Sequence, residues 1–497
     1  MKRLLTLTNV IIIVVIVAFG YFVFTKFKKN EEEQIDTVQP VQSIAVLPFI
    51  NLDKDSSQQY FSEGLAEDIL NSLSQLKNIR ISARYSSFKF NDNDNAADIG
   101  KKLGVKNVLA GSYQLQGDKI NITTELINAE NGTHFWSEQY NDNIDNIFSL
   151  QNKIVSAVEE KLNITLDDSD EQIKKPTVNI DAYKLYLKGR ASWNLATQKG
   201  LTDGIDFFKQ AIALDSNYAA AYAGIADCYN LLGYQNYLAP KESFPKAFEA
   251  ATKALKMDAT LAEPHASLGY YDFYYQWDWA SAEQEFRSAI SLNPNYALAY
   301  DWYGYYLTGM KRFDEAKIML AKAAALDPLS APIVKDMGFS LYYKGDYDSA
   351  IQTLQHALQM NPKLGIALIW TGRSYQAQKK YGEAINAFEQ AIKLPPAGWP
   401  VALAQVGNAY GVSGNIAGAN NVLDTLMALY PRQYISAYLV ALLYVGLGKN
   451  DLAFEWLNKG YAEKTNWMVW LKGDPRWIPL YPDKRYKELM NKVGLPQ

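Results

Sequence analysis

Three carboxylates on one predicted helix are the first residues whose types and spacing could do chemistry. Glu63, Glu67 and Asp68 are adjacent or one turn apart within YFSEGLAEDILNSLSQL (60–76), whose apolar residues recur at helical spacing. Two positioned carboxylates can serve as a general acid and a general base. The solvated face of an ordinary helix shows the same pattern, and the sequence contains no recognisable nucleophile with an adjacent base. We therefore predict no catalytic residue and no enzyme activity.

Metal and phosphate sites are also not predicted. DNDNAADIGKKL looks like a calcium loop that begins at Asp92, but Ala97 stands where such a loop needs glycine and Leu103 where it needs glutamate. The glycines of GKKLG and GVKNVLAGS lack the spacing of a phosphate loop. His265 and His356 lie in different parts of the chain and form no metal pair. We expect neither a metal nor a cofactor.

Composition narrows the class of partner. The 497 residues have a formal net charge of −4, which does not provide the basic field that general nucleic-acid binding needs. We therefore expect no nucleic acid among the partners. The single cysteine, Cys228, excludes an intramolecular disulfide.

One helical pattern recurs along the second half of the chain. MKRFDEAKIMLAKAAALDP (310–328), KGDYDSAIQTLQHALQMNP (344–362) and KKYGEAINAFEQAIKLPP (379–396) follow one another at a nearly fixed interval. A small residue in the helix before each of these recurs every 34 or 35 residues, at Gly304, Gly338, Gly372, Gly407 and Ala441. A period of 34 residues is typical of tetratricopeptide repeats, whose helix pairs stack into a superhelix. We predict about eight repeats over residues 181–466 and a C-terminal cap over residues 467–497.

The chain begins with a long apolar segment. Residues 4–24 contain no charged side chain, and 21 residues of helix span about 30 Å, the thickness of a bilayer core. We predict a single transmembrane anchor within residues 1–29, followed by an acidic linker over residues 30–40. Basic residues flank both ends of the segment, so charge does not decide which side the rest of the chain faces.

Residues 41–165 alternate between strand and helix patterns. SIAVLPFI (43–50) is typical of a buried strand, and IRISARYS (79–86) predicts another. KNVLAGSYQL and KINITTELIN, joined by QGD, predict a β-hairpin. The fold class is therefore multidomain: a transmembrane helix, a small α/β domain with a mixed sheet, a linker over residues 166–180, and an all-α tetratricopeptide superhelix.

This α/β segment also resembles a known domain. The motifs AVLPF, SEGLAEDI, LGVKNVLAGS and IFSLQ resemble those of the TolB amino-terminal-like domain of bacterial signalling proteins. The resemblance implies a position directly before tetratricopeptide repeats, often behind a cyclase, kinase or DNA-binding module. Only a few residues precede the predicted anchor, so we expect no such output module in this sequence.

A protein or peptide partner is expected on the concave repeat surface, which the first helix of each repeat lines. On the predicted register, the candidate partner-binding residues are Tyr270, Asp301, Tyr305, Lys335, Phe339, Tyr342, Arg373 and Asn408. Aromatic rings beside cations are typical of recognition hot spots. The alternative is that the rings fill gaps between neighbouring repeats.

Two classes of function follow. The first is a membrane-anchored scaffold or adaptor in bacterial envelope signalling or complex assembly. Its localisation would be the inner membrane, with most of the chain in the periplasm, as the resemblance implies. The second is a regulatory or nucleotide-related enzyme in the α/β domain, or a cytoplasmic-facing regulator of a separate cyclase or transcription factor. The sequence leaves the oligomeric state open.

Overall fold

The computed structural model describes residues 42–53, 58–76, 78–91, 93–164, 177, 179–394 and 399–495. The predicted membrane span 4–24, the linker 30–40 and most of the linker 166–180 lie outside these residues. Within the described part of the chain, no helix is both long and apolar enough to cross a membrane.

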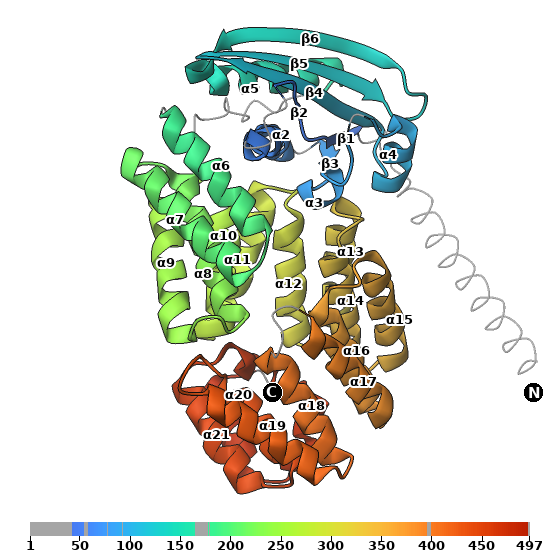
Figure 1. Cartoon of the computed structure of the whole chain (residues 1–497), viewed down its shortest axis with the longest axis vertical. Helices are drawn as coiled ribbons and strands as arrows, with labels where there is room; N and C mark the ends of the chain where they lie inside the picture. Colours follow the sequence, from blue (N-terminus) through green and yellow to red (C-terminus); the bar gives the residue numbers. More distant parts are fainter. Residues whose placement is uncertain are drawn as a thin grey trace, which may run out of the picture. The chain divides into compact units, whose positions relative to one another are not determined.

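A mixed sheet forms the first part of the fold (Figure 1), with strands in the order β3-β1-β4-β5-β6. β1 (Gln42–Val46) runs parallel to β4 (Asn107–Gln116), and β2 (Ile50–Asn51) extends this parallel pairing along β4. β5 (Lys119–Asn128) pairs antiparallel with both β4 and β6 (His134–Asn143), and β3 (Ile79–Ile81) lies on the other side of β1. The predicted hairpin is confirmed. Gly117, with a φ of 62°, makes the tight turn between β4 and β5.

Helices cover both faces of the sheet. α2 (Gln59–Ser74) and α5 (Ile147–Lys161) share a core with β1, β4 and β5, whereas α4 (Ala96–Leu103) packs in a separate apolar cluster on the other face. The short helix α3 (Arg84–Ser87) replaces the second half of the strand predicted over residues 79–86, so that part of the prediction is wrong. After Ile81 the chain turns toward the repeats, where Ser86 bonds Asp327.

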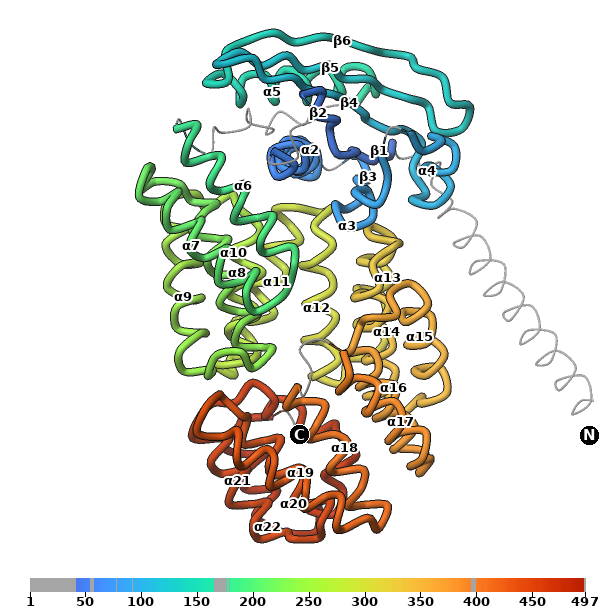
Figure 2. The backbone as a smooth tube through the Cα atoms, in the orientation of Figure 1, coloured from blue at the N-terminus to red at the C-terminus, as the bar shows by residue number. Residues whose placement is uncertain are grey.

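Eight antiparallel helix pairs follow in the described residues. They are α6 (Ile180–Asn194) with α7 (Gln198–Leu214), α8 (Ala219–Tyr234) with α9 (Pro240–Met257), α10 (Ala262–Tyr271) with α11 (Trp279–Leu292), α12 (Ala297–Gly309) with α13 (Phe313–Leu326), α14 (Ala331–Lys344) with α15 (Tyr347–Met360), α16 (Gly365–Ala377) with α17 (Tyr381–Lys393), α18 (Pro400–Val412) with α19 (Ile416–Leu429), and α20 (Ala437–Gly446) with α21 (Asn450–Ala462). A one-turn π-helix, η3 (Asp272–Gln276), extends α10. Figure 2 follows the backbone through the successive pairs.

The small residues of the repeat are explained by close packing between the two helices of a pair. A Cβ added at Gly304 would lie 2.7 Å from the side chain of Leu320, and one added at Gly338 would lie 2.6 Å from Leu354. These distances leave no room for a side chain. The small residue that recurs every 34 residues therefore marks the position where the first helix of each pair packs closely against the second helix.

The chain ends in two 3₁₀ helices and a short α-helix: η4 (Asn466–Trp470), η5 (Pro475–Leu480) and α22 (Lys484–Val493). Trp467, Trp470, Trp477 and Leu480 are all buried, as expected for a cap. However, η4 contacts η3, five repeats earlier in the chain, so this segment does more than cover the last repeat.

Candidate binding cavity on the inner face of the repeats

The α/β domain is bonded directly to the ends of the repeat helices. The amide nitrogen Nδ2 of Asn295 donates to the carbonyl oxygens of Ser74 (3.1 Å) and Ile79 (3.0 Å), and its Oδ1 accepts from the backbone N–H of Ile81 (3.0 Å). Asn295 precedes α12 and is buried. One side chain in a repeat turn therefore satisfies three backbone groups of the sheet domain.

The carboxylates on α2 form a second part of this junction. Glu67 accepts hydrogen bonds from Nε (3.1 Å) and Nη2 (2.9 Å) of Arg190 on α6, and Nε of Arg84 lies 2.8 Å from its other oxygen. Burial opposes the charge of Glu67, but the two guanidinium groups outweigh it and lower the pKa of this carboxyl. Of the three carboxylates predicted as an acid/base pair or a solvated face, Glu67 is instead a buried, charge-paired contact between the sheet domain and the first repeat. Glu63 is partly exposed and pairs with Arg84.

The C-terminal segment lies across the inner face of the repeats. The indole of Trp470 contacts the rings of Phe273 (centroids 5.7 Å apart), Phe339 (4.9 Å) and Tyr343 (4.8 Å), which come from η3 and α14. The Tyr305 ring of α12 is 6.2 Å away. The chain therefore uses its own C-terminus to fill much of the surface that a partner was expected to occupy.

Two charged residues continue this contact. Asp474 is fully buried and accepts from Nε of Arg476 (2.8 Å) and from the hydroxyl of Tyr342 (3.3 Å). The guanidinium of Arg373 lies over the rings of Trp370 (4.1 Å) and Trp467 (5.1 Å). Burial lowers the pKa of Arg373, and the nearby charge of Arg476 adds to the effect.

The eight candidate residues lie on the predicted helices but are not exposed. All of them are buried: Tyr270, Asp301, Tyr305, Lys335, Phe339, Tyr342, Arg373 and Asn408. At these positions the side chains pack inside the protein, as in the alternative that the rings fill gaps, and their role in partner binding stays a prediction. Phe339, Tyr342 and Arg373 contact the C-terminal segment, and Asn408 bonds Gln376 on α16 and the carbonyl of Leu442 on α20.

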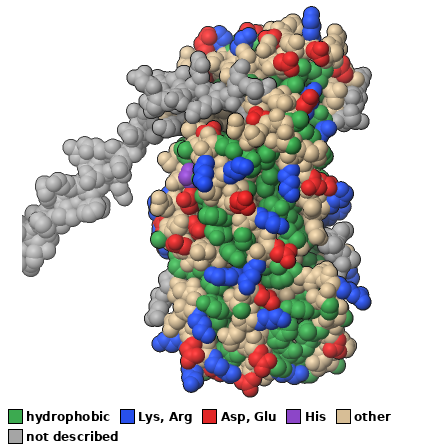
Figure 3. Space-filling view, turned by 90° about the vertical axis from the view of Figure 1, so that its left-hand side faces the viewer, with side chains coloured by type: hydrophobic (Ala, Val, Ile, Leu, Met, Phe, Trp, Pro, Cys, Tyr) green, Lys and Arg blue, Asp and Glu red, His purple; other side chains and the backbone are tan. Residues whose placement is uncertain are grey.

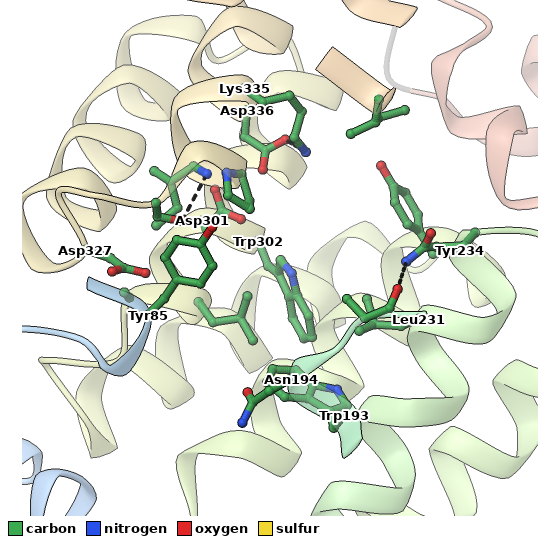
Figure 4. A pocket seen from close by; sticks show the side chains of 18 of the residues that line it. Tyr85, Trp193, Asn194, Leu231, Tyr234, Asp301, Trp302, Asp327, Lys335 and Asp336 are labelled. Atoms are coloured by element: carbon green, nitrogen blue, oxygen red, sulfur yellow. Dashed lines mark hydrogen bonds and ion pairs between the residues drawn. The ribbon is translucent and has the colours of Figure 1, made fainter. Parts of the chain in front are cut away.

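The other four candidates, Tyr270, Asp301, Tyr305 and Lys335, line a cavity of about 580 Å³. α2 and α3 of the sheet domain form one part of its wall, and α6, α8, α10, α12, α14, α16 and α18 form most of the rest, with Trp467 contributing from the C-terminal segment. Figure 4 shows Trp193 and Asn194 at the end of α6 on one side of this space and Asp301 and Trp302 from α12 on another. Sequence periodicity could not reveal a cavity whose wall combines both domains.

A compact group of charges lies in the cavity wall. Lys335 Nζ is bonded to the carboxylate of Asp336 and to the Tyr305 hydroxyl (3.1 Å). The buried carboxyl group of Asp336 on α14 lies close to that of Asp301 on the neighbouring helix α12. Burial, followed by the proximity of Asp336, raises the pKa of Asp301 well above its usual range.

Several buried polar atoms of the lining have no hydrogen-bond partner among the described residues. They are Trp193 Nε1, Asn194 Nδ2, Asn236 Oδ1, Tyr274 OH, Asp301 Oδ1 and Trp467 Nε1. Buried polar groups in folded proteins are normally paired, so a group of open ones around a cavity indicates a surface prepared for polar contacts. In the described part of the chain no cluster of three or more His, Cys, Asp or Glu could hold a metal ion.

Two family models match parts of the chain. A tetratricopeptide repeat model matches residues 336–399, which correspond to α14–α17 and the turn after them. The helix pairs are tetratricopeptide repeats. The model of the second domain of HilA/YgeH-like transcriptional regulators matches residues 40–157. This match covers the mixed-sheet domain, and the resemblance to the TolB amino-terminal-like domain stays a prediction.

Curated relatives match over part of their length. A protein of Rhizobium meliloti (strain 1021) that is named as an adenylate cyclase is 27% identical over 231 residues, covering 46% of this chain and 39% of that protein. Transcriptional regulator HilA of Salmonella typhimurium is 23% identical over 338 residues, covering 66% of this chain and 53% of HilA. The chain thus spans about half or less of these relatives. A solved structure of IFIT1 with Gppp-AAAA is 15% identical, with a TM-score of 0.45 over 70% of this chain and 76% of IFIT1.

Proposed function

We propose that the protein is a membrane-anchored scaffold or adaptor that binds protein partners in bacterial envelope signalling or complex assembly. The observation that supports this proposal most directly is the array of tetratricopeptide repeats bonded to the mixed-sheet domain through Asn295 and Glu67. Repeat arrays of this kind present extended surfaces for other proteins. Residues 4–24 would anchor the chain, and the bulk would lie in the periplasm.

The position of the C-terminal segment changes where a partner can bind. Because Trp470 and Asp474 occupy much of the inner face, a partner segment would reach the repeats through the cavity that Tyr270, Asp301, Tyr305 and Lys335 line, or over the outer helices. The face in Figure 3 shows interspersed cationic and anionic side chains with hydrophobic ones between them. A surface of mixed charge suits a protein partner better than a polyanion.

A second candidate function is a cytoplasmic-facing regulator of a separate cyclase or transcription factor. The matches to HilA and to the Rhizobium protein favour it, because both relatives are named for such outputs. In that case the repeats and the sheet domain would act as a regulatory module in trans. The two candidates require opposite sides of the membrane.

Topology in living cells tests the first proposal. Two reporters are fused after Gln497: alkaline phosphatase, which is active only outside the cytoplasm, and a green fluorescent protein that matures only inside it. We expect phosphatase activity without fluorescence, and a fusion lacking residues 1–29 should reverse the pattern. Fluorescence of the full-length fusion would contradict the periplasmic assignment and favour the regulator. If the full-length fusion appears in the soluble fraction as much as the fusion lacking residues 1–29, the predicted membrane anchor would be contradicted.

A further inference from the structure

In the cavity wall most cations are paired with a carboxylate, whereas one carboxylate oxygen has no partner among the described residues. Arg84 and Arg190 both bond Glu67, and Lys335 bonds Asp336, so three of the cations in the lining are already paired. The ammonium of Lys335 bonds the carboxylate of Asp336, whereas Asp301 experiences only the nearby charge of this ammonium. Asp301 Oδ1 is left without a hydrogen-bond partner in the described residues, although this residue is only 5% exposed.

A buried carboxylate oxygen without a hydrogen-bond partner is stabilised by a donor or a cation that reaches it. Lys335 balances the charge of only one of these carboxylates, so without a second cation the Asp301–Asp336 pair keeps a proton, because two buried carboxylates close together do not both ionise. The charge of Asp327, another acidic residue of the cavity wall, also raises the pKa of Asp301. A positively charged group that reached Asp301 would pair with the open oxygen and relieve this repulsion.

Aromatic rings surround the same part of the cavity. Trp302 lies beside Tyr270 with ring centroids 4.5 Å apart, and Tyr274 is 4.6 Å from Tyr270 on the other side. The faces of such rings attract cations, and their apolar surface fits the body of a small organic ligand. The Tyr274 hydroxyl also has no hydrogen-bond partner in the part of the chain that the structure describes, and it lies in the same wall.

We propose that this cavity binds an organic cation, an amine or guanidinium on a small apolar body, whose charge pairs with the carboxylate of Asp301. The cation can belong to a free small molecule or to the basic side chain of a peptide, since both present the same group to Asp301. An anionic ligand fits less well, because Arg84, Arg190 and Lys335 are each already bonded to a carboxylate and the other cation of the lining, Lys363, is exposed. The inference does not depend on the adaptor function, and either can fail while the other holds.

Calorimetric titration of the full-length chain in a nonionic detergent tests the site. The probes are benzylamine and benzamidine, with benzyl alcohol as the neutral counterpart of the same shape. A Leu-Arg-Leu tripeptide and its Leu-Gln-Leu counterpart form the peptide arm. We expect the cations to bind at least about tenfold more tightly than their neutral counterparts, as expected for a buried charge-assisted contact. Tighter binding of the tripeptide than of benzamidine would assign the site to a peptide side chain, and the reverse to a free ligand.

Three variants make the test specific. Asp301→Asn preserves the shape of the side chain and should abolish the preference for the cation. Asp314→Asn, at a side chain that is 96% exposed on α13, should bind as the unchanged protein does. Trp302→Leu removes one ring and leaves the carboxylate, so several-fold weaker binding is expected even if Asp301→Asn does not fold. Equal binding of charged and neutral probes by the unchanged protein, or an undiminished preference in folded Asp301→Asn, would overturn the proposal.

Discussion

Asp68 connects three helices through one carboxylate oxygen. Its Oδ2 accepts from the hydroxyl of Tyr183 on α6 (2.5 Å) and from Nε2 of Gln151 on α5 (3.2 Å), while Asp68 itself belongs to α2. Burial raises the pKa of Asp68 to about 7, and the nearby Glu67 adds to the rise, in spite of the two hydrogen bonds. Between these two pKa values, 3.8 in the unfolded chain and about 7 in the folded protein, the folded protein therefore keeps a proton on Asp68 that the unfolded chain has lost.

This difference predicts how stability depends on pH. The unfolded carboxyl ionises near 3.8 and the folded one near 7, so the stabilisation is present at low pH and is lost as pH rises between these values. Asp68→Asn keeps a hydrogen-bond acceptor but cannot ionise. We expect the free energy of unfolding of the variant, relative to the unchanged protein, to increase steadily from pH 4 to pH 7, as measured by urea denaturation.

The control for this experiment is Asp118→Asn in the exposed turn between β4 and β5, which should run parallel to the unchanged protein over the same range. Other buried acids, such as Asp227, are present in all three proteins and cancel from the comparison. Curves for Asp68→Asn and the unchanged protein that differ by a constant would show that Asp68 titrates normally in the folded state.

At the scale of elements, local patterns in the sequence were sufficient to predict most helices and strands. The 34-residue period predicted the helix pairs because each first helix must meet its second at a small residue such as Gly304. Gly104, at a φ of 66°, ends α4, and a glycine in this conformation is a common helix end. The segment IRISARYS was mistaken for one strand, since its apolar alternation ends at Ile81 and the following turn is also bonded to the repeats. Ser86, for example, bonds Asp327 in the turn after α13.

The candidate site could be predicted only in part, for the same physical reason. Helical periodicity placed Tyr305, Phe339 and Lys335 on the inner face, but it contains no information about a segment that comes back across that face. Trp470 and Trp467 belong to the end of the chain, and their aromatic contacts are with residues of several earlier repeats. Three tryptophans close together after the last repeat, Trp467, Trp470 and Trp477, were the one available signal, and they were interpreted as a cap alone.

The C-terminal segment should therefore stabilise the repeats along much of their length. Trp470 is 3% exposed and touches rings from η3, α12 and α14. Trp470→Ala would leave a large cavity on the inner face, and such truncations typically cost about 3–5 kcal/mol. We expect a loss of this size in the free energy of unfolding, measured by urea denaturation with tryptophan fluorescence and circular dichroism.

Ile478→Ala is the matched control, because Ile478 lies in the same segment and is 56% exposed. Its substitution should change the free energy of unfolding by less than about 0.5 kcal/mol. An equally small effect of Trp470→Ala would show that the segment leaves the inner face in solution, and the cavity would then be open to larger partners.

At the scale of the whole described chain, the sheet domain and the repeats share one set of buried contacts. Tyr183 and Leu187 of the first repeat belong to the same apolar cluster as α2 and α5. The side chain of Leu187 fits against Gly64, where an added Cβ would lie 2.5 Å from it. Apolar packing, the Glu67–Arg190 pair and the Asn295 hydrogen bonds all act across the same junction. We expect the two parts to unfold together.

Differential scanning calorimetry of the full-length chain tests this coupling through Asn295. Asn295→Ala leaves the backbone groups of Ser74, Ile79 and Ile81 without their partner, at a cost of about 1–3 kcal/mol for each buried group that finds no other. The equivalent residue of an earlier repeat, Asn217, is exposed, so Asn217→Ala isolates the effect of the junction from that of the turn. The unchanged protein and Asn217→Ala should melt in one transition. Asn295→Ala should melt earlier and, because the junction is weakened more than either part, in a broadened or divided transition. Two separate transitions in the unchanged protein would mean that the domains are independent, and the cavity between them would then lack a fixed wall.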